Sequence, residues 1–539
     1  MRFYKYAAIA TLTFSGLAAS AQTNQFDGKS WWDHVKYLAD DRLEGRQTGS
    51  PGLKKAEEYI VDDLKKNGIQ PAGTDGYYQP IKFIQRQIDE SKSSLELTPL
   101  ICAGICPPTK LVLGDDAILS MRVDAASHID APLVFAGYGL RVPEAHIDDL
   151  KGLDAKGTVL VVFAGSPSQL SAALSAHYQS TAQRAKILRE TGALGYVMIP
   201  NPAAMDIPWE RIKTSRLQPA MGYADKSLND SGSAEIAVYF NPASADRLFA
   251  GSGHTFDEIA ALGKERKPLP SFPLTVGIKA TQTVIETPVE SSNVIGKLEG
   301  SDPKLKDTYV VLSAHVDHLG IGEPINGDKI YNGAMDNGSG TALLMDMAET
   351  LPRLHPKRSI LFVFVTAEEK GLLGSRYFAT HPTVPLKSMV ADINTDMFLP
   401  IIPLKLLTVY GLAESTLGDD VTEVAEKDGV KVQPDPEPLR NIFIRSDQYS
   451  FIRDGIPALA MKVGFEKGSP EEKTNQQWLH DRYHAPSDDI NQPVDLAAAG
   501  KFEDIVRDLT MKVADDSQRP EWKPDSFFKR FENQQEQGK

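Results

Sequence analysis

The chain has 539 residues, of which 41% are hydrophobic and 24% carry a charge. This length exceeds what one ordinary hydrophobic core accommodates, so we expect two or more folded domains. The formal net charge is −14 at pH 7. A strongly acidic chain repels phosphate groups, which argues against nucleic acid or an anionic membrane surface as the main partner.

The first 21 residues have the pattern of a secretory signal peptide. Arg2 and Lys5 precede an apolar run from about residue 7 to residue 19, and Ala19-Ser20-Ala21 provides the small residues that favour cleavage before Gln22. The run is shorter than the roughly 20 residues that a spanning helix needs, and no later segment supplies such a run, so we expect no stable membrane insertion. The pattern predicts an exported protein, periplasmic or secreted.

The only two cysteines are Cys102 and Cys106, in the stretch ICAGICPP. In an oxidising compartment they either close a small local disulfide or remain free thiols, and the sequence leaves both alternatives open. No further metal ligand lies nearby in the sequence, so we expect no catalytic part for either cysteine.

Residues 30–68 predict two helices separated by the glycine-containing turn LEGRQTGSPG. Trp31, Val35 and Leu38 share one face of the first helix, and the apolar residues from Leu53 to Leu64 follow the same spacing in the second. Gly68 is in a suitable position to end the second helix.

The residue pattern is different between about residue 126 and residue 288. Short strand-like runs such as APLVFAGYGL, GTVLVVFAG and AEIAVYF are separated by turns, and the single strong helical pattern among them is TAQRAKILRETGA. This pattern predicts a β-rich module inserted into the main domain.

From residue 289 to about residue 518, continuous apolar runs alternate with helical patterns. The strongest runs are TYVVLSAHVDH, RSILFVFVTAEE, MVADINTDM and IPALAMKV. This alternation is typical of an α/β fold with a mixed, mostly parallel sheet flanked by helices on both faces. Residues 519–539 read as a polar C-terminal tail.

Five of these strand ends or the loops that follow them carry residues of the metal-ligating type. In such sheets, sites form at the carboxyl ends of the strands. The residues are His315, Asp317 and His318 in SAHVDHLG, Asp336 in NGAMDNGSG, Glu368 and Glu369 in TAEEKG, Asp396 in INTDMF, and His480 and His484 in LHDRYHAPSDD.

If these strands are neighbours, several carboxylates are forced together at one edge of the sheet. Like charges in one cleft repel each other, so such a cluster is sustained mainly when a cation is present. Two imidazoles with three carboxylates suit divalent zinc, and cobalt or manganese are alternatives. Three carboxylates are more than one catalytic zinc usually takes, which favours two metal ions about 3.5 to 4 Å apart with one bridging carboxylate.

The ordered set HVDHLG, DNGSG, TAEEKGLLGS, NTDM and YHAPSDD resembles the dizinc aminopeptidase family. This family includes bacterial leucyl aminopeptidases and, more distantly, glutamate carboxypeptidase II and the transferrin receptor. LADDRLEGRQTGSPG resembles the N-terminal segment of the family, and the stretch from GTVLVVFAG to GYVMIPNP resembles its inserted protease-associated domain. The resemblance implies a zinc-peptidase fold formed by residues 22–125 and 289–518, with residues 126–288 as the protease-associated domain.

The resemblance also implies a role for each site residue. Asp336 would bridge two zinc ions. His315 and Asp396 would complete one metal site, and Glu369 and His484 would complete the other.

Three further residues would support catalysis. Glu368 would be the general base, Asp317 would accept a hydrogen bond from the imidazole of His315, and Tyr483 would hydrogen-bond the oxyanion of the tetrahedral intermediate. His318 and His480 have no ligand role in the family pattern and are interpreted as polar lining or surface residues. Ser446 and Asp447, in RSDQYSFIRDGIPA, are interpreted as helix-capping residues and left out of the site.

The predicted function is that of an exported dizinc aminopeptidase acting on peptides. A carboxypeptidase or dipeptidase of the same fold is an alternative, because the metal ligands do not define which end of the substrate is held. A non-catalytic, receptor-like binding protein is a third hypothesis, but such a protein should have lost ligands that are all present here. The sequence predicts no oligomeric state.

Overall fold

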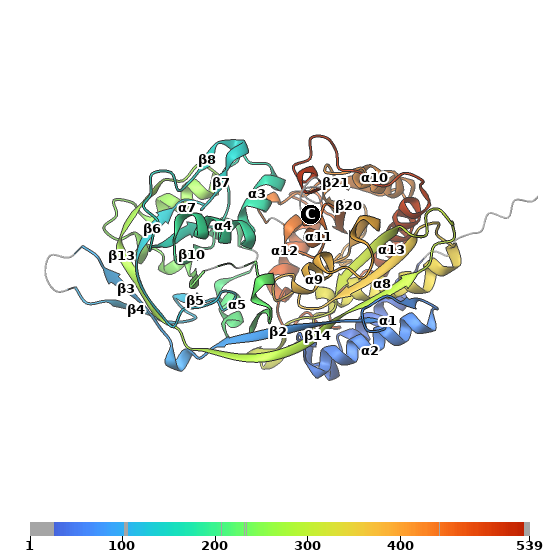
Figure 1. Ribbon diagram of the computed structural model, residues 1–539, viewed down its shortest axis with the longest axis horizontal. Coiled ribbons are helices and arrows are strands. Elements are labelled where there is room, and N and C mark those ends of the chain that lie inside the picture. Colours follow the sequence, from blue (N-terminus) through green and yellow to red (C-terminus); the bar gives the residue numbers. More distant parts are fainter. Residues whose placement is uncertain are drawn as a thin grey trace, which may run out of the picture.

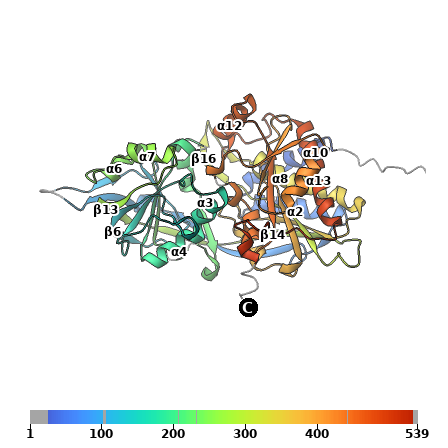
Figure 2. The same ribbon diagram turned by 90° about the horizontal axis from the view of Figure 1, so that it is seen from above.

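The computed structural model describes residues 26–101, 106–205, 207–230, 232, 234–440 and 442–532. The predicted signal peptide and Cys102 lie outside these residues. Cys106 is disulfide-bonded, and Cys102 is the other cysteine of the chain. Two lobes, each built on its own sheet, lie side by side in Figure 1 and, seen from above, in Figure 2. The predicted α/β fold class, with mixed sheets flanked by helices, is confirmed.

The larger sheet has ten strands. They are β1 (Gln70–Pro71), β2 (Tyr78–Ile88), β11 (Ala220–Tyr223), β14 (Val284–Leu298), β15 (Tyr309–His315), β18 (Ser359–Val365), β19 (Met389–Asn394), β20 (Leu406–Tyr410), β21 (Lys431–Gln433) and β22 (Ala458–Val463). Their order is β11-β2-β14-β18-β15-β19-β22-β20-β21, and β1 pairs with β14. The central strands β18, β15, β19 and β22 are mutually parallel.

Helices cover both faces of this sheet. They are α1 (Lys29–Leu38), α2 (Pro51–Lys66), α8 (Ser339–Thr350), α9 (Leu373–Thr380), α10 (Leu417–Lys427), α11 (Gln448–Arg453), α12 (Pro470–Arg482) and α13 (Leu496–Asp515). Successive residues of a strand face opposite sides, so Val310 and Leu312 of β15 pack into the core with α1, α2, α8, α10 and α13. Val311 packs on the other face, with α9 and α11. None of the helices in the described ranges is both long and apolar enough for a membrane span.

The two N-terminal helices form as predicted. Trp31, Val35 and Leu38 are buried along one face of α1. Helix α2 begins at Pro51, and the side chain of Ser50 accepts a hydrogen bond from the main-chain N–H of Leu53.

The second lobe is built on an eight-stranded sheet. Its strands are β3 (Ser94–Pro99), β4 (Thr109–Leu111), β5 (Ala117–Leu119), β6 (His128–Ala136), β9 (Val159–Phe163), β10 (Gly195–Ile199), β12 (Ile236–Phe240) and β13 (Ser271–Thr281). Their order is β4-β3-β13-β6-β9-β10-β12-β5. The sheet thus includes β3, β4 and β5, which precede the predicted boundary at residue 126, and the domain boundaries stay a prediction.

The single helix predicted in this lobe, TAQRAKILRETGA, is α4 (Thr181–Thr191). The described part of the lobe contains four more: α3 (Ala172–Gln179), α5 (Trp209–Ile212), α6 (Asp246–Phe249) and α7 (Phe256–Lys264). The prediction of a single helix was wrong because these helices are short, and α3 and α4 follow each other with only Ser180 between them. Two small hairpins complete the chain: β7 (Arg141–Val142) with β8 (Ile147–Asp148), and β16 (Gly320–Ile325) with β17 (Asp328–Tyr331).

A long antiparallel ribbon joins the two lobes. β14 pairs with β2 from Val284 to Val294, and its last residues, Val294–Leu298, pair with β18 in the larger sheet. In Figure 1 the two strands run together along the lower edge of the molecule from one lobe to the other.

The C-terminal segment differs from the predicted polar tail. Trp522, Phe528 and Phe531 are buried in the hydrophobic cluster on the α9 and α11 face of the larger sheet. Three large apolar side chains spaced irregularly among polar residues produce no helical or strand period, so the sequence pattern does not reveal this packing.

Glu57 of α2 is expected to make stability depend on pH. It is buried, and burial raises the pKa of its carboxyl to about 8, against a smaller opposing effect of a hydrogen bond from the main chain of Ser292. The unfolded chain loses this proton near pH 4.5 and the folded chain only near pH 8, so the free energy of unfolding falls between these values.

We therefore expect Glu57→Gln to raise the melting temperature by a few degrees at pH 8 but by much less at pH 5. Glu58→Gln, at an exposed position of the same helix, is the matched control and should leave the melting temperature unchanged at both pH 8 and pH 5. An equal shift of the Glu57→Gln variant at both pH values would contradict the assignment.

Candidate metal centre

The carboxyl ends of three parallel strands bring the predicted ligands together. His315 is the last residue of β15, Glu368 and Glu369 follow β18, and Asp396 follows β19. β15 lies between β18 and β19, so the three ends meet at one edge of the sheet. Asp336 comes from the turn before α8 and His484 from the loop after α12.

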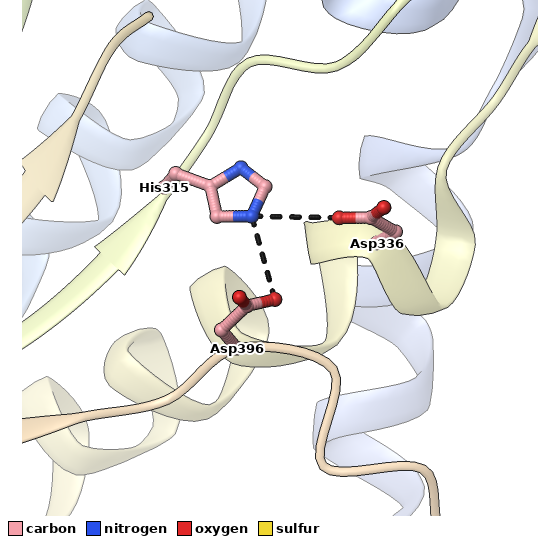
Figure 3. A group of neighbouring side chains, drawn as sticks. All are labelled: His315, Asp336 and Asp396. Carbon is pink, nitrogen blue, oxygen red and sulfur yellow. Dashed lines mark ion pairs between the residues drawn. The ribbon is translucent and has the colours of Figure 1, made fainter. Parts of the chain in front are cut away.

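The first ligand group consists of His315, Asp336 and Asp396. The Nε2 atom of His315 lies 3.4 Å from Oδ1 of Asp336 and 3.5 Å from Oδ1 of Asp396. Figure 3 shows the imidazole at the end of its strand, with the two carboxylates approaching from a turn and a loop. The side chains of His315 and Asp336 are almost completely buried.

The second ligand group shares Asp336 with the first. The Nε2 atom of His484 lies 3.2 Å from Oδ2 of Asp336 and 3.4 Å from Oε2 of Glu369. Asp336 therefore presents Oδ1 to the histidine of one group and Oδ2 to a histidine of the other, which is the geometry that a bridging carboxylate requires.

These groups have the chemistry and the spacing that zinc requires. Ligand atoms about 2.0 to 2.2 Å from a tetrahedral zinc ion lie roughly 3.3 to 3.6 Å from each other, close to the four separations above. Within the described ranges, Nε2 of His315 and Oδ1 of Asp396 are buried and make no hydrogen bond. Buried polar atoms without a partner are costly, so their convergence fits a bound cation.

The adjacent residues Glu368 and Glu369 belong to different parts of the centre. Glu369 faces His484 with Oε2 and His318 with Oε1. Oε2 of Glu368 instead lies 3.9 Å from Nε2 of His315. Both glutamates line the neighbouring cavity, but the side chain of Glu368 is 12% exposed and that of Glu369 is 5% exposed. Glu369 thus has the surroundings of a ligand, and Glu368 is the more accessible of the two.

The protonation of these carboxyls follows their neighbours. Burial raises the pKa of Glu369, but the imidazoles of His484 and His318 outweigh it and hold that pKa well below its usual value. Burial raises the pKa of Glu368 well above its usual value, and the charge of Glu369 adds to this effect against the opposing imidazole of His315.

Asp317 differs from the prediction in one contact. Nδ1 of His315 lies 3.0 Å from the main-chain carbonyl oxygen of Asp317, not from its carboxylate. The carboxylate accepts hydrogen bonds from the main-chain N–H of Glu368, at 3.0 Å, and from the hydroxyl of Thr48, at 2.9 Å. Asp317 therefore connects the loop after β15 to the loop that carries Glu368.

His318 is the residue whose position the sequence pattern did not reveal. It is fully buried, with Nδ1 2.8 Å from Oε1 of Glu369, and it forms a possible ligand group with Asp336 and Glu369. Only its spacing of three residues from His315 pointed toward the site. His480 is exposed and contacts Asp481, in agreement with its interpretation as a surface residue.

Tyr483 and Asp447 complete the list of predicted residues. Tyr483 directly follows α12 and precedes His484, with its ring centre 3.9 Å from that imidazole, and it lines the cavity. Asp447 precedes α11, but its side chain makes no capping hydrogen bond. It is completely buried, and burial raises its pKa to about 7 against the opposing effect of His315.

Hydrogen bonds to the main chain hold the ligand loops in place. The amide oxygen of Asn337 accepts from the N–H of Met397, and its Nδ2 donates to the carbonyl of Thr395, so Asn337 binds both sides of Asp396. The carboxylate of Asp488 accepts from the N–H groups of Met335 and Asp336, at 2.9 and 3.0 Å.

Comparisons with known proteins find similarity over this part of the chain. Residues 293–510 match Peptidase family M28. The probable leucine aminopeptidase 2 of Aspergillus oryzae (strain ATCC 42149 / RIB 40) is 30% identical over 215 residues, which cover 37% of this chain and 40% of that relative. Aminopeptidase Y of Saccharomyces cerevisiae (strain ATCC 204508 / S288c) is 29% identical over 221 residues, covering 38% of this chain and 35% of that relative. The matched region therefore spans two fifths or less of each relative's length.

A solved structure resembles nearly the whole chain in fold. The aminopeptidase from Aneurinibacillus sp. strain AM-1 aligns with a TM-score of 0.56 over 92% of this chain and 96% of its own. The sequence identity is 18%, so this likeness concerns the fold.

Asp336→Ala should lose most of the bound zinc, because Asp336 offers one oxygen to each ligand group. The zinc content of the purified variant, measured by elemental analysis after dialysis against zinc buffer, tests this expectation, and circular dichroism verifies folding. His480→Ala removes an exposed histidine outside both groups and should keep the zinc content of the unmodified protein. Full zinc occupancy in Asp336→Ala would rule out a bridging role.

Proposed function

Because residues 293–510 match Peptidase family M28, we propose that the protein is a dizinc aminopeptidase. It would remove N-terminal residues from peptides. The observation that carries the proposal is the position of Asp336, whose two oxygens face His315 with Asp396 on one side and His484 with Glu369 on the other.

Glu368 is the proposed general base. Two zinc ions held by His315, Asp336, Glu369, Asp396 and His484 would polarise the peptide carbonyl and acidify a bound water. The carboxylate of Glu368 accepts a proton from the attacking water and returns it to the nitrogen of the leaving amine. Its place on the cavity wall, 3.9 Å from the imidazole of His315, supports this role.

Two other residues position the reaction. The hydroxyl of Tyr483, on the same cavity wall, would donate a hydrogen bond to the oxygen of the scissile carbonyl as negative charge develops there. Asp317 would hold Glu368 in place through the hydrogen bond from its main-chain N–H.

Export and the role of the second lobe are parts of the same proposal. The basic and apolar residues at the start of the sequence support export by a signal peptide, to the periplasm or the medium. Residues 126–288 would be a protease-associated domain that restricts access to the centre, because the cavity beside Glu368 is lined by residues of both lobes.

A panel of substrates tests the proposal directly. Peptides with a free N-terminus should be hydrolysed, and the same peptides with an acetylated N-terminus should not. A chelator should abolish hydrolysis, and added zinc should restore it. Equal cleavage of acetylated peptides would exclude an aminopeptidase, and activity that persists after chelation would exclude the metal mechanism.

Glu368→Gln should keep the bound zinc but lower kcat by about 100-fold or more, because the amide cannot carry the proton. Steady-state kinetics combined with elemental analysis measures both quantities. Glu466→Gln, at an exposed position that does not line the cavity, is the control and should retain the normal rate. A near-normal kcat in Glu368→Gln would show that another group acts as the base.

A further inference from the structure

A cavity of about 440 Å³ lies between the two lobes, directly beside the candidate metal centre. Glu368, Asp396 and His484 line this cavity from the lobe that contains the larger sheet. Arg184 and Tyr196 line it from α4 and β10 of the second lobe. In Figure 1, α3 and α4 of the second lobe face the region of α11 and α12. A volume of this size is in the usual range for small-ligand pockets and suits a short peptide.

The charge of the cavity wall is opposite to that of the chain as a whole. Nine arginine and lysine side chains line the cavity. Apart from the carboxylates of Asp336, Glu368, Glu369 and Asp396, the only acidic residue among the described lining residues is Asp230. Because the chain has a net charge of −14, this concentration of cations does not reflect its composition.

Several of these cations are neutralised by carboxylates and contribute to the structure. Arg453 of α11 forms an ion pair with Asp230 of the second lobe, at 3.2 Å through Nη2. Arg376 of α9 lies 2.5 Å from Asp454. Arg86 of β2 lies 2.6 Å from Asp124. These pairs fix the cavity walls and leave little charge for a ligand.

Three further cations, in the second lobe and in the loop of Glu369, lack a carboxylate partner. In the described part of the chain, Arg122, Arg184 and Lys370 form no ion pair. Arg122 donates from Nη2 to the main-chain carbonyl of Glu369, at 2.7 Å, and the guanidinium of Arg184 lies 5.6 Å from the ring centre of Tyr196. Lys370 is buried beside Glu369 in the ligand loop.

The position of these cations relative to the metal centre limits what they can bind. The contact of Arg122 with the main-chain carbonyl of Glu369 places positive charge at the backbone of a proposed ligand. An extended peptide advances about 3.3 to 3.6 Å per residue, so an anion held here would lie within a residue or two of a bond cleaved at the centre. Under the proposed function, the carboxylates of Asp336, Glu369 and Asp396 would bind metal, and Glu368 would accept the proton of the attacking water.

Unpaired cations in a partly desolvated cavity favour an anionic ligand. Removing a charge from water is costly unless an opposite charge replaces the lost hydration. A guanidinium binds a carboxylate through two parallel hydrogen bonds, which makes arginine especially suited to this recognition.

We propose that Arg122, Arg184 and Lys370 bind a carboxylate of the substrate, so that the enzyme prefers peptides with a carboxylate close to the scissile bond. This inference rests on the proposed function and specifies the substrate class. The carboxylate is supplied either by the free C-terminus of a very short peptide or by an aspartate or glutamate side chain. Both sources present the same chemistry to the three cations.

Three pairs of peptides separate these sources. Leu-Ala and Leu-Ala-NH2 differ in the C-terminal carboxylate. Leu-Glu-NH2 and Leu-Gln-NH2 differ in the carboxylate of the second side chain. Glu-Ala-NH2 and Gln-Ala-NH2 differ in the carboxylate of the first side chain. We expect kcat/KM to be about tenfold or more higher for the carboxylate member of at least one pair, the range expected for a charged hydrogen bond. Hydrolysis of all three pairs at rates within about twofold would overturn the proposal, because a charged contact contributes more than this.

Arg184→Gln tests whether the cations cause this preference. Arg184 lies on α4, forms no ion pair with the described residues, and belongs to the lobe that holds none of the proposed metal ligands. The variant should lower kcat/KM for the preferred carboxylate peptide about tenfold and leave its uncharged partner almost unchanged. Arg184→Lys keeps the charge without the two parallel hydrogen bonds and should recover part of the loss.

Arg189→Gln is the matched control, because Arg189 is exposed on the same helix and does not line the cavity. It should behave like the unmodified protein toward all six peptides. If Arg184→Gln and Arg189→Gln have the same kinetics, the proposal fails.

A binding experiment separates failure of this inference from failure of the proposed function. If none of the six peptides is hydrolysed, the aminopeptidase proposal fails, but titration calorimetry with the zinc-loaded protein still measures their binding. Binding of a carboxylate peptide that is about tenfold tighter than that of its partner, and that is lost in Arg184→Gln, would support the carboxylate site. Equal affinities within all three pairs would overturn it.

Discussion

The structure depends on balancing the negative charge that converges at one edge of the larger sheet. Asp336, Glu368, Glu369 and Asp396 meet there with little access to water. At low permittivity, like charges at these distances repel strongly. Imidazoles compensate part of this charge, and a buried guanidinium contributes from a greater distance: burial lowers the pKa of Arg46 to about 10, opposed by the charges of Asp488 and Asp336. Under the proposed function, bound zinc would supply the remaining balance.

The scaffold that maintains this arrangement is made largely of hydrogen bonds to the main chain. Arg46 donates to the carbonyls of Val316, Asn332 and Gly333, so one buried side chain connects the loop after His315 to the turn before Asp336. Asn337 and Asp488 connect the same turn to other ligand loops. Each of these contacts uses a polar group that would otherwise lack a hydrogen-bond partner in the interior. The same hydrogen bonds therefore position the ligand loops and satisfy the buried main chain.

The sequence predicted those features that depend on local pattern. The ends of β15, β18 and β19 could be located because each apolar run stops at a polar ligand, and parallel neighbours bring such ends together. The separate roles of Glu368 and Glu369 came from family resemblance, because two adjacent glutamates are equivalent in spacing. Features that depend on distant contacts were missed. The pairing of β3 with β13 joins residues far apart in sequence, and the burial of His318 depends on a loop conformation that has no periodic signature.

The ribbon formed by β2 and β14 has a consequence for the order in which the chain can fold. β2 comprises residues 78–88 and its main partner comprises residues 284–298, so the whole second lobe is synthesised between them. β18, which pairs with the end of β14, follows later still. Since domains fold as units and ribosomes release the chain from its N-terminus, the second lobe can complete its core first. Until β14 is synthesised, β11 is the only neighbour with which β2 can pair. We therefore expect formation of the larger sheet to be the slow, non-local step of folding.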